Sequence, residues 1–241
     1  SPVIFTSYQD DTAGGDTNGD GVSYGSPGDW DTVSFTNGNH GAAIANVQVR
    51  YGGYGSYYGM SISGSYSVSV SDCTFSENDD GLRIDVASAS VSGCDFLENR
   101  DDGLYLSESC ITVTVSGNTF YGNGDGLVAD DCSPSISDNE FVENGNPIEL
   151  VDTSFPTYSG NTFQAGGGDI DAIGISGTIN SSGTWTYLGI PYNVTSSLSI
   201  NEGESYTDSN GNGRYDSGEP FTDENANGER DVVTVTIPPG T

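Results

Sequence analysis

The sequence predicts an all-β fold in which short strands wind into a coil, a parallel β-solenoid, and each turn of the coil stacks on the next. Three observations predict it: a repeat of fixed length, an apolar–polar alternation inside each repeat, and one phenylalanine at the same place in each repeat. Five consecutive segments start at Gly59, Gly81, Gly103, Gly126 and Pro147, which are 22, 22, 23 and 21 residues apart. A unit this short cannot bury a hydrophobic face alone, so it must stack on its neighbours.

Each repeat contains two runs in which apolar and polar residues alternate. The first run follows the glycine and carries the apolar residues Met60/Ile62, Leu82/Ile84, Leu104/Leu106, Leu127/Ala129 and Ile148/Leu150. The second run precedes an asparagine-rich turn and carries Val68/Val70, Ala89/Val91, Val113/Val115, Ile136 and Tyr158. A period of two over so few residues is typical of half-buried strands, so the sequence predicts two strands in each repeat.

Equivalent residues of successive repeats should lie above one another, because neighbouring strands are about 4.8 Å apart. The phenylalanines expected in one column are Phe75, Phe96, Phe120, Phe141 and Phe163. A second column contains Cys73, Cys94, Asn118, Asn139 and Asn161, and a third contains Asn78, Asn99, Asn123 and Asn144. Asparagine tolerates left-handed turn geometry, and stacked amides can hydrogen-bond to one another. We therefore expect ladders of amides along the solenoid axis.

At these residues the chain resembles the right-handed parallel β-helix repeat proteins of the pectate-lyase-like superfamily, over roughly residues 30–200. The resemblance implies the fold and says little about function, since this scaffold hosts lyases, hydrolases, adhesins and inert fibres. We expect one continuous domain. Residues 1–30 would form a partial first turn with an acidic loop, residues 30–200 the β-helix, and residues 201–241 a loop insertion with a closing strand.

The segments outside the five repeats have the composition of strands and loops. Residues 3–6, 32–35 and 43–50 are expected to be strands of the first turns, joined by an acidic loop over residues 8–30. A loop rich in tyrosine and glycine covers residues 51–59. After Gly168 the alternation loosens, with strand-like runs at 170–175, 184–188, 192–195 and 198–200, and residues 232–237 would form the closing strand.

The chain is strongly acidic: five arginines and no lysine stand against 35 Asp and Glu residues, for a net charge of −30. Binding to nucleic acid needs cationic contacts to phosphate, so this function is excluded. The chain has no apolar run long enough to span a bilayer, so we expect no direct membrane insertion. A subset of the carboxylates is expected to bind metal.

Residues 208–219, DSNGNGRYDSGE, match every position of the twelve-residue loop that binds calcium in EF-hands. Oxygen-bearing side chains occupy positions 1, 3 and 5, a glycine occupies position 6, a backbone carbonyl is offered at position 7, and carboxylates occupy positions 9 and 12. In this order the residues are Asp208, Asn210, Asn212, Gly213, Arg214, Asp216 and Glu219. The sequence predicts calcium here, because hard oxygen ligands in a flexible loop suit this ion.

Two further segments carry part of the same pattern. The second contains Asp223, Asn225, Asn227, Glu229 and Asp231, with Thr234 where the last glutamate would stand. The third contains Asp16, Asn18 and Asp20 followed by Gly21, with Pro27 at position 12, so Asp10, Asp11 or Asp29 would have to complete its ligands. The three segments resemble the EF-hand-like and dockerin-like loops of extracellular proteins. No amphipathic helices flank them, which favours a structural clip over a conformational switch.

The four cysteines form two pairs that are one repeat apart, Cys73 with Cys94 and Cys110 with Cys132. Neighbouring turns would place both pairs within the range of a disulfide. Directly stacked side chains are slightly too far apart for a relaxed bridge. Each pair could be a disulfide or two stacked buried thiols.

The leading hypothesis from the sequence is an extracellular or cell-surface, non-enzymatic structural or adhesive module. Its strand-like ends favour end-to-end self-association or continuation in a longer chain. The alternative is a carbohydrate-active enzyme or polysaccharide-binding module on the same fold. Paired aspartates at 79/80, 101/102 and 130/131 could serve acid catalysis. The first two pairs recur with the repeat ahead of Gly-Leu, as turn residues do, and this favours the non-enzymatic interpretation.

Overall fold

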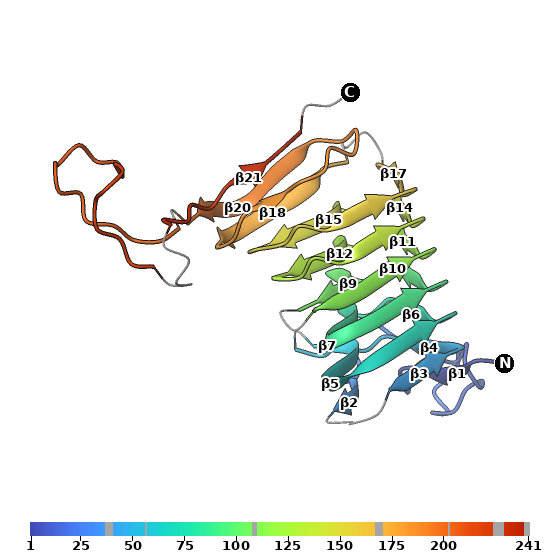
Figure 1. The fold of residues 1–241 in the computed structure, drawn as a ribbon. Coiled ribbons are helices and arrows are strands. Elements are labelled where there is room, and N and C mark those ends of the chain that lie inside the picture. The colour runs from blue at the N-terminus through green and yellow to red at the C-terminus, as the bar shows by residue number, and fades with distance from the viewer. Residues whose placement is uncertain are drawn as a thin grey trace.

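The computed structural model describes residues 1–36, 41–55, 57–107, 110–166, 171–201, 203–223 and 229–238, without the side chains of residues 65 and 66. The described residues form a parallel β-solenoid and contain no helix, so the predicted fold class is confirmed. Figure 1 shows the turns stacked one on another from the N-terminal end to the C-terminal end. No described segment is a helix that could cross a membrane.

Two sheets run along the solenoid, and all pairings between its named strands are parallel. The first sheet contains, in order, β1 (Val3–Phe5), β4 (Val47–Arg50), β6 (Thr74–Ser76), β8 (Asp95–Leu97), β11 (Thr119–Tyr121), β14 (Glu140–Val142) and β17 (Thr162–Gln164). The second sheet contains β2 (Val33–Thr36), β3 (Ala42–Ala45), β5 (Tyr58–Ser71), β7 (Asp80–Ser92), β9 (Asp102–Leu106), β10 (Thr112–Ser116), β12 (Asp125–Asp130), β13 (Ser135–Ser137), β15 (Asn146–Val151), β16 (Thr157–Ser159), β18 (Ile173–Ile179) and β20 (Tyr192–Ile200). A separate pair consists of β19 (Gly183–Thr184) and β21 (Val235–Thr236).

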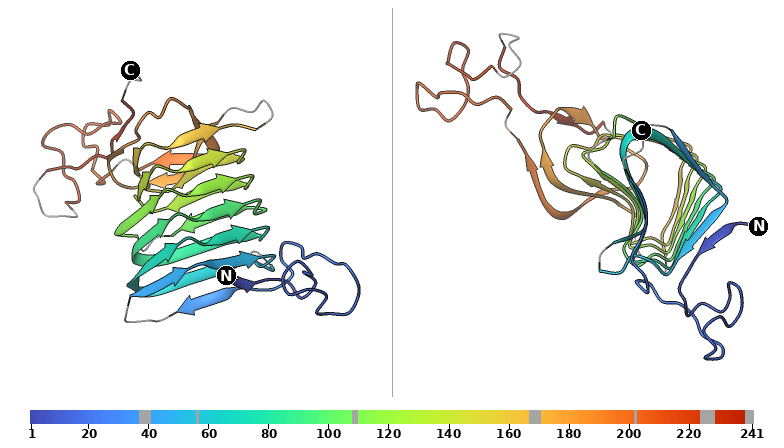
Figure 2. Two further views of the ribbon diagram at one scale, coloured as in Figure 1. Left: turned by 90° about the vertical axis from the view of Figure 1, so that its right-hand side faces the viewer. Right: turned by 90° about the horizontal axis from the view of Figure 1, so that it is seen from below.

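The second sheet covers two faces of the solenoid, because its longest strands pass around a corner. β5 and β7 have 14 and 13 residues, and their register shifts between Gly64 and Ser67, where the chain bends. In later turns the same two faces are made by separate strands, β9 and β10, then β12 and β13, then β15 and β16. Each of these turns therefore contributes one strand to each of three faces, as the view along the axis shows (Figure 2).

The phenylalanine column predicted from the repeat is confirmed. The rings of Phe75, Phe96, Phe120, Phe141 and Phe163 stack nearly parallel, with centroids 4.7–5.4 Å apart and planes tilted by 5–11°. The first four are fully buried, and the apolar residues of both alternating runs fill the rest of the interior. The alternation is visible in β10, where Val113 and Val115 point inward between exposed threonines.

Both amide ladders are also present. Asn78, Asn99, Asn123 and Asn144 are linked by hydrogen bonds from each Nδ2 to the next Oδ1, 2.8–3.0 Å long. Asn118, Asn139 and Asn161 form the second ladder in the same way, at 2.9 and 3.0 Å. Each Oδ1 also accepts the backbone N–H of the preceding rung, and each Nδ2 donates to a backbone carbonyl. The ladders thus satisfy polar backbone groups that the turns would otherwise bury without partners.

The left-handed residue of each turn is not the ladder asparagine, as the sequence suggested, but the residue before it. In one turn these residues are Glu77, Glu98, Gly122 and Glu143, with φ of 52°, 53°, 67° and 54°. In the other they are Asp72, Gly93, Gly117, Asp138 and Gly160, with φ from 52° to 65°. The ladder asparagine does not have a positive φ. Its side chain points inward and hydrogen-bonds along the solenoid axis.

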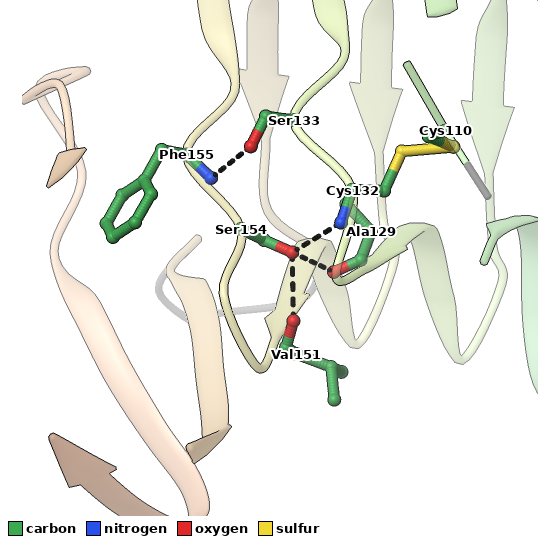
Figure 3. Close-up of a disulfide and its surroundings, with 7 residues drawn as sticks. All are labelled: Cys110, Ala129, Cys132, Ser133, Val151, Ser154 and Phe155. Carbon is green, nitrogen blue, oxygen red and sulfur yellow. Dashed lines mark hydrogen bonds between the residues drawn. A yellow bond between two sulfur atoms is a disulfide. The ribbon is translucent and has the colours of Figure 1, made fainter. Parts of the chain in front are cut away.

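The two cysteine pairs differ. Cys110 and Cys132 form a disulfide with a Cα–Cα distance of 5.3 Å, whereas Cys73 and Cys94 are buried thiols. Figure 3 shows the disulfide beside Ser154, whose hydroxyl accepts the N–H of Cys132 and lies within hydrogen-bond distance of the carbonyls of Ala129 and Val151. Ser154 therefore provides hydrogen-bond partners for backbone groups at this corner, as the asparagines do in the ladders.

The amide ladder generates a stability prediction for Asn123→Ala. The change removes the acceptor of the Asn99 N–H and side-chain amide, and the donor to the carbonyl of Phe96. We expect a loss of about 2–4 kcal/mol in the free energy of unfolding, because buried polar groups lose their partners. Chemical denaturation measures it. The control is Ser90→Ala on the outer face, with an expected change below about 0.5 kcal/mol; equal losses in both variants would contradict a special role for the ladder.

Candidate functional site

The N-terminal acidic loop, between β1 and β2, contains the strongest candidate metal site. It projects from the flank of the first turns (Figure 2). Carboxylate oxygens of Asp11, Asp16 and Asp20 lie within 4.8 Å of one another, and no other group of three possible ligands does so among the described residues. Asp11, one of the three residues considered to complete this site, is the one that the fold brings to it.

Asp11 has one satisfied and one unsatisfied oxygen. Its Oδ2 accepts the backbone N–H of Ser23 at 2.7 Å. Its Oδ1 is buried and finds no hydrogen-bond donor among the described residues. A buried carboxylate oxygen without a donor is costly unless a cation is bound to it. The donor set and this oxygen therefore fit a hard cation such as calcium.

The backbone of this loop has the turn geometry of its motif. Asp16 accepts the N–H groups of Gly19 and Gly21 at 2.6 and 3.2 Å, and Asn18 accepts the N–H of Asp20 at 3.2 Å. The two glycines have φ of 75° and 92°, which other residues rarely adopt. These bonds aim the side chains of the loop at a common centre.

The loop is fastened to the solenoid by Asp10 and Asp29. Asp10 is buried and forms an ion pair with Arg50 of β4 at 2.9 Å. Burial opposes its ionisation, but hydrogen bonds from Thr12 and Thr6, together with Arg50, lower the pKa of Asp10 overall. Asp29 accepts the hydroxyl of Ser7 at 2.6 Å. The backbone N–H of Asp29 also donates to the carbonyl of Tyr51 at 2.9 Å, so the loop is attached to the first turn at two points.

The C-terminal loop at 208–219 repeats the same turn. Asp208 accepts the N–H groups of Gly211 and Gly213 at 2.6 and 2.7 Å, and Asn210 accepts that of Asn212 at 3.1 Å. The bond from Gly213 contributes most to lowering the pKa of Asp208, so this carboxylate is held ionised. The two loops, far apart in the sequence, thus share one hydrogen-bonding pattern.

The remaining positions of this loop are arranged differently from the motif. Asp216 accepts the side-chain amides of Asn210 and Asn212 at 2.7 and 2.6 Å, so positions 3, 5 and 9 converge. Glu219 instead accepts the N–H groups of Ser209 and Asp216 at 2.8 and 2.9 Å and closes the loop. Arg214 extends into solvent, with its Nε 3.6 Å from Asp216. A cation here would require the two asparagine amides to rotate their oxygens inward.

The second C-terminal segment is described only in part. Asn225 and Asn227 of this predicted site lie outside the described residues. Asp231 is described, and its N–H donates to Glu204 at 3.0 Å. Asp223 and Glu229 are described as well, and both have partners.

A column of carboxylates follows one corner of the solenoid, and the sequence analysis did not identify it as a unit. It consists of Asp80, Asp102 and Asp125, at the start of β7, β9 and β12; Asp125 pairs with Asp102, whose N–H donates to Asp80. The sequence signal for this column is the tripeptide Asp-Gly-Leu, which recurs in three repeats and begins at Asp125 in the third. The pair 130/131 is not equivalent, because Asp130 is the last residue of β12 and not the first; its carboxylate accepts the hydroxyl of Tyr105 at 2.5 Å.

The carboxylates of this column are harder to ionise than usual. Burial raises the pKa of Asp80 to about 6, even though the N–H of Asp102 donates to it. Burial, with the neighbouring charges of Asp80 and Asp125, raises the pKa of Asp102 to about 8. Burial also raises the pKa of Asp125. Stacked carboxylates one strand apart cannot all be charged without repulsion.

A shallow cavity of about 320 Å³ lies beside this column. It is lined by Thr32, Ser34, Tyr57, Tyr58, Ser61, Ser63, Arg83 and Asp85. The guanidinium of Arg83 lies 5.6 and 5.7 Å from the ring centroids of Tyr58 and Tyr105. Aromatic rings, one cation and several hydroxyls are therefore gathered on one outer face.

The outer face formed by the C-terminal ends of β5 and β7 together with β10, β13 and β16 carries two columns of hydroxyl side chains, here called the hydroxyl face. Ser69, Ser90, Thr114, Ser135 and Thr157 form one column, and Ser71, Ser92, Ser116, Ser137 and Ser159 form the next. All are exposed or half-buried. In a chain with a net charge of −30, these ten positions carry no charge.

Comparison with known proteins adds one finding. A family model described as "Right handed beta helix region" matches residues 26–163, which is more than half of the chain. No curated protein and no solved structure matches the chain.

The carboxylate column predicts how stability depends on pH. The folded protein keeps a proton on Asp102 up to a pKa of about 8, whereas the unfolded chain releases it near pH 4. The folded state thus binds more protons between these values, so its stability falls as pH rises through this window. Asp102→Asn should remove part of this fall, on the order of 1–3 kcal/mol between pH 5 and pH 9.

Urea denaturation of both proteins at the two pH values provides the measurement. Asp95→Asn, at an exposed position on β8, is the matched control and should leave the slope of stability against pH unchanged. A wild-type protein that gains stability over the same range, or an Asp102→Asn variant with the wild-type slope, would contradict the assignment.

Proposed function

Because the chain belongs to the right-handed β-helix family, we propose that it is an extracellular, non-enzymatic structural or adhesive module stabilised by calcium. In this proposal the solenoid is a stiff rod within a cell-surface protein or an end-to-end filament. The observation that carries it is the cluster of Asp11, Asp16 and Asp20, whose carboxylates lie within 4.8 Å of one another and include a buried oxygen without a donor among the described residues.

The mechanism is electrostatic. Three carboxylates at this distance repel one another, and a bound calcium ion replaces the repulsion by attraction. The loop is joined to the first turn through Asp10 and Arg50, so ordering the loop also holds the end of the solenoid. In the C-terminal loop, calcium would replace the side-chain amides of Asn210 and Asn212 as the partner of Asp216, once both amides rotate their oxygens inward. Loops of this type in extracellular modules bind calcium with Kd on the order of 10⁻⁴–10⁻³ M.

The adhesive part of the proposal rests on the outer faces. The hydroxyl face, formed by the C-terminal ends of β5 and β7 and by β10, β13 and β16, is where an acidic rod can approach another surface without repulsion. At the two ends of the solenoid, edge strands leave backbone groups and apolar side chains unpaired within the described residues: Phe5 is 37% exposed and Val194 of β20 is 55% exposed. Such edges favour continuation in a longer chain or stacking on a second copy.

A polysaccharide-binding or carbohydrate-active module is the second candidate, favoured by one specific observation. Tyr58, Arg83 and Tyr105 are clustered beside the carboxylates of Asp80 and Asp102 and a cavity of about 320 Å³. Aromatic rings with hydroxyls and charged groups are suited to sugar rings. The carboxylates recur with the repeat ahead of Gly-Leu, as turn residues do, which favours the non-enzymatic proposal.

The calcium proposal predicts that EDTA lowers the melting temperature and that calcium restores it. With about 10 mM calcium and the affinities above, each site contributes enough binding free energy to raise Tm by roughly 3–10 °C. Circular dichroism during heating provides the measurement. Magnesium at the same concentration should restore little, because it requires more rigid geometry.

Two variants test which loop binds the calcium that raises Tm. Asp16→Asn and Asp208→Asn should each remove part of the calcium-dependent increase in Tm, and Asp95→Asn, on a strand of the solenoid, should keep all of it. A melting curve that is the same in EDTA and in calcium would refute the proposal for both loops.

The second candidate is tested by binding to a panel of neutral and acidic polysaccharides, scored also for new reducing ends. Binding by the wild-type protein that falls at least tenfold in Tyr105→Ala and is unchanged in Tyr187→Ala would favour it. Tyr187 is a matched control because it is 48% exposed and far along the chain from Arg83. The absence of binding and of reducing ends across the panel would favour the structural module.

A further inference from the structure

The dipeptide Asn-Gly occurs seven times in the chain, and five copies lie within the described residues. Two of the five belong to the first amide ladder and begin at Asn123 and Asn144. Three lie in the acidic loops and begin at Asn18, which is half-buried, and at Asn210 and Asn212, which are exposed. An asparagine before glycine is among the least stable amides in proteins, because the glycine nitrogen, with no Cβ beside it, can approach the side-chain carbon and displace ammonia. The fold places this reactive dipeptide in two opposite environments.

In the ladder the reaction is blocked by packing. Asn123 is 3% exposed, and its amide is hydrogen-bonded to side chains of both neighbouring turns. A Cβ on Gly124 would lie 2.7 Å from the carbonyl oxygen of Asp101, and one on Gly145, which follows Asn144, would meet the carbonyl of Gly124. The amide therefore has no room to rotate, and the glycine nitrogen is shielded from water.

In the C-terminal loop the same dipeptide is open to solvent. Asn210, Gly211, Asn212 and Gly213 are all exposed. A Cβ on either glycine would meet no atom of the described residues within 4 Å. Water therefore reaches both the side-chain amides and the nitrogens that can attack them.

The loop also polarises the two amides. The Oδ1 of Asn210 accepts the N–H of Asn212 at 3.1 Å, and the Oδ1 of Asn212 accepts the N–H of Arg214 at 2.9 Å. Each of these oxygens gains negative charge when the following glycine nitrogen adds to its carbon. A fixed N–H donor at that oxygen stabilises the charge. The turn that positions side-chain oxygens for a cation thus also favours this reaction.

The reaction needs only water. The backbone nitrogen of Gly213 bonds to Cγ of Asn212, and the side-chain nitrogen leaves as ammonia with the proton of the glycine. One water molecule then opens the five-membered imide ring, which gives aspartate or isoaspartate according to the carbonyl it attacks. Gly211 and Asn210 react in the same way. In sum, one amide and one water become one carboxylate and one ammonium ion.

We propose that Asn210 and Asn212 are sites of spontaneous deamidation, which converts the C-terminal loop into a carboxylate loop that binds calcium more tightly. In the amide form, one oxygen of Asp216 accepts both side-chain amides, at 2.7 and 2.6 Å. Aspartate at either position removes one of these donors and puts a negative charge in its place. The loop then repels itself until a cation binds. The calcium part of this inference rests on the function proposed above.

The first test incubates the full folded chain in EDTA at neutral pH and follows each Asn-Gly peptide by mass spectrometry. Asn210 and Asn212 should change from amide to carboxylate, with part of the product recognised by an isoaspartyl methyltransferase. Asn123 and Asn144 should remain amides. In guanidinium, where the ladder is unfolded, all four should convert at similar rates. Loop amides that persist in the folded chain while the unfolded chain converts, or a folded Asn123 that converts as fast as Asn212, would overturn the proposal.

The second test measures calcium binding by calorimetry in an Asp16→Asn background, which removes a ligand of the N-terminal site. The variant Asn210→Asp/Asn212→Asp has the aspartate product at both positions. Its Kd for calcium should be roughly tenfold lower than that of the freshly purified amide form, because the number of charged ligands tunes the affinity of such loops.

The matched control is Asn180→Asp/Asn193→Asp, which adds the same charge at two exposed positions outside the loop and should leave Kd unchanged. Equal Kd values in all three proteins would overturn the calcium part of the inference. Conversion of the loop amides with no calcium bound by any of the proteins would refute calcium binding by this loop, and only the deamidation would stand.

Discussion

The interaction on which this structure depends is the hydrogen bond from one buried asparagine to the next along the solenoid axis. The turns between strands bring backbone N–H and carbonyl groups into the interior, where no water can solvate them. In the ladder of Asn78, Asn99, Asn123 and Asn144, each side chain serves both kinds of group and also bonds to its neighbour. This repeated bond fixes the register, and the register in turn places phenylalanine on phenylalanine.

The register also determines where the many carboxylates of the chain can be placed. The interior of the solenoid is apolar or amide-lined, so carboxylates are confined to corners, loops and outer faces. At one corner Asp80, Asp102 and Asp125 are stacked so closely that they resist ionisation. In the loops the charge is concentrated in the pattern that calcium prefers, and the hydroxyl face is left uncharged. A solenoid with one strip of neutral hydroxyl groups is consistent with the mechanical or adhesive role proposed above.

Much of the fold could be predicted from the repeat, because stacking makes a period in sequence into a column in space. The phenylalanine column and both amide ladders were found in this way. The repeat could not predict features that depend on the detailed backbone geometry. The left-handed residue precedes the asparagine, and only one cysteine pair is bridged: Cys110 lies outside the ladder, where side chains can turn toward each other, whereas Cys73 lies within it. At the candidate site, the motif predicts Asp16 and Asp20. Asp11 comes close to them only through the path of the folded loop, so the sequence alone could not choose among Asp10, Asp11 and Asp29.

The most direct test of the central claim is hydrogen exchange of the ladder amides, followed residue by residue by nuclear magnetic resonance. The backbone N–H groups of Asn99, Asn118, Asn123 and Asn139 donate to side chains and not to strands. If the ladders hold the solenoid together, these four should exchange only through global unfolding, with the same free energy as the most protected strand residues. Exchange at the rate of the exposed loops would contradict the account.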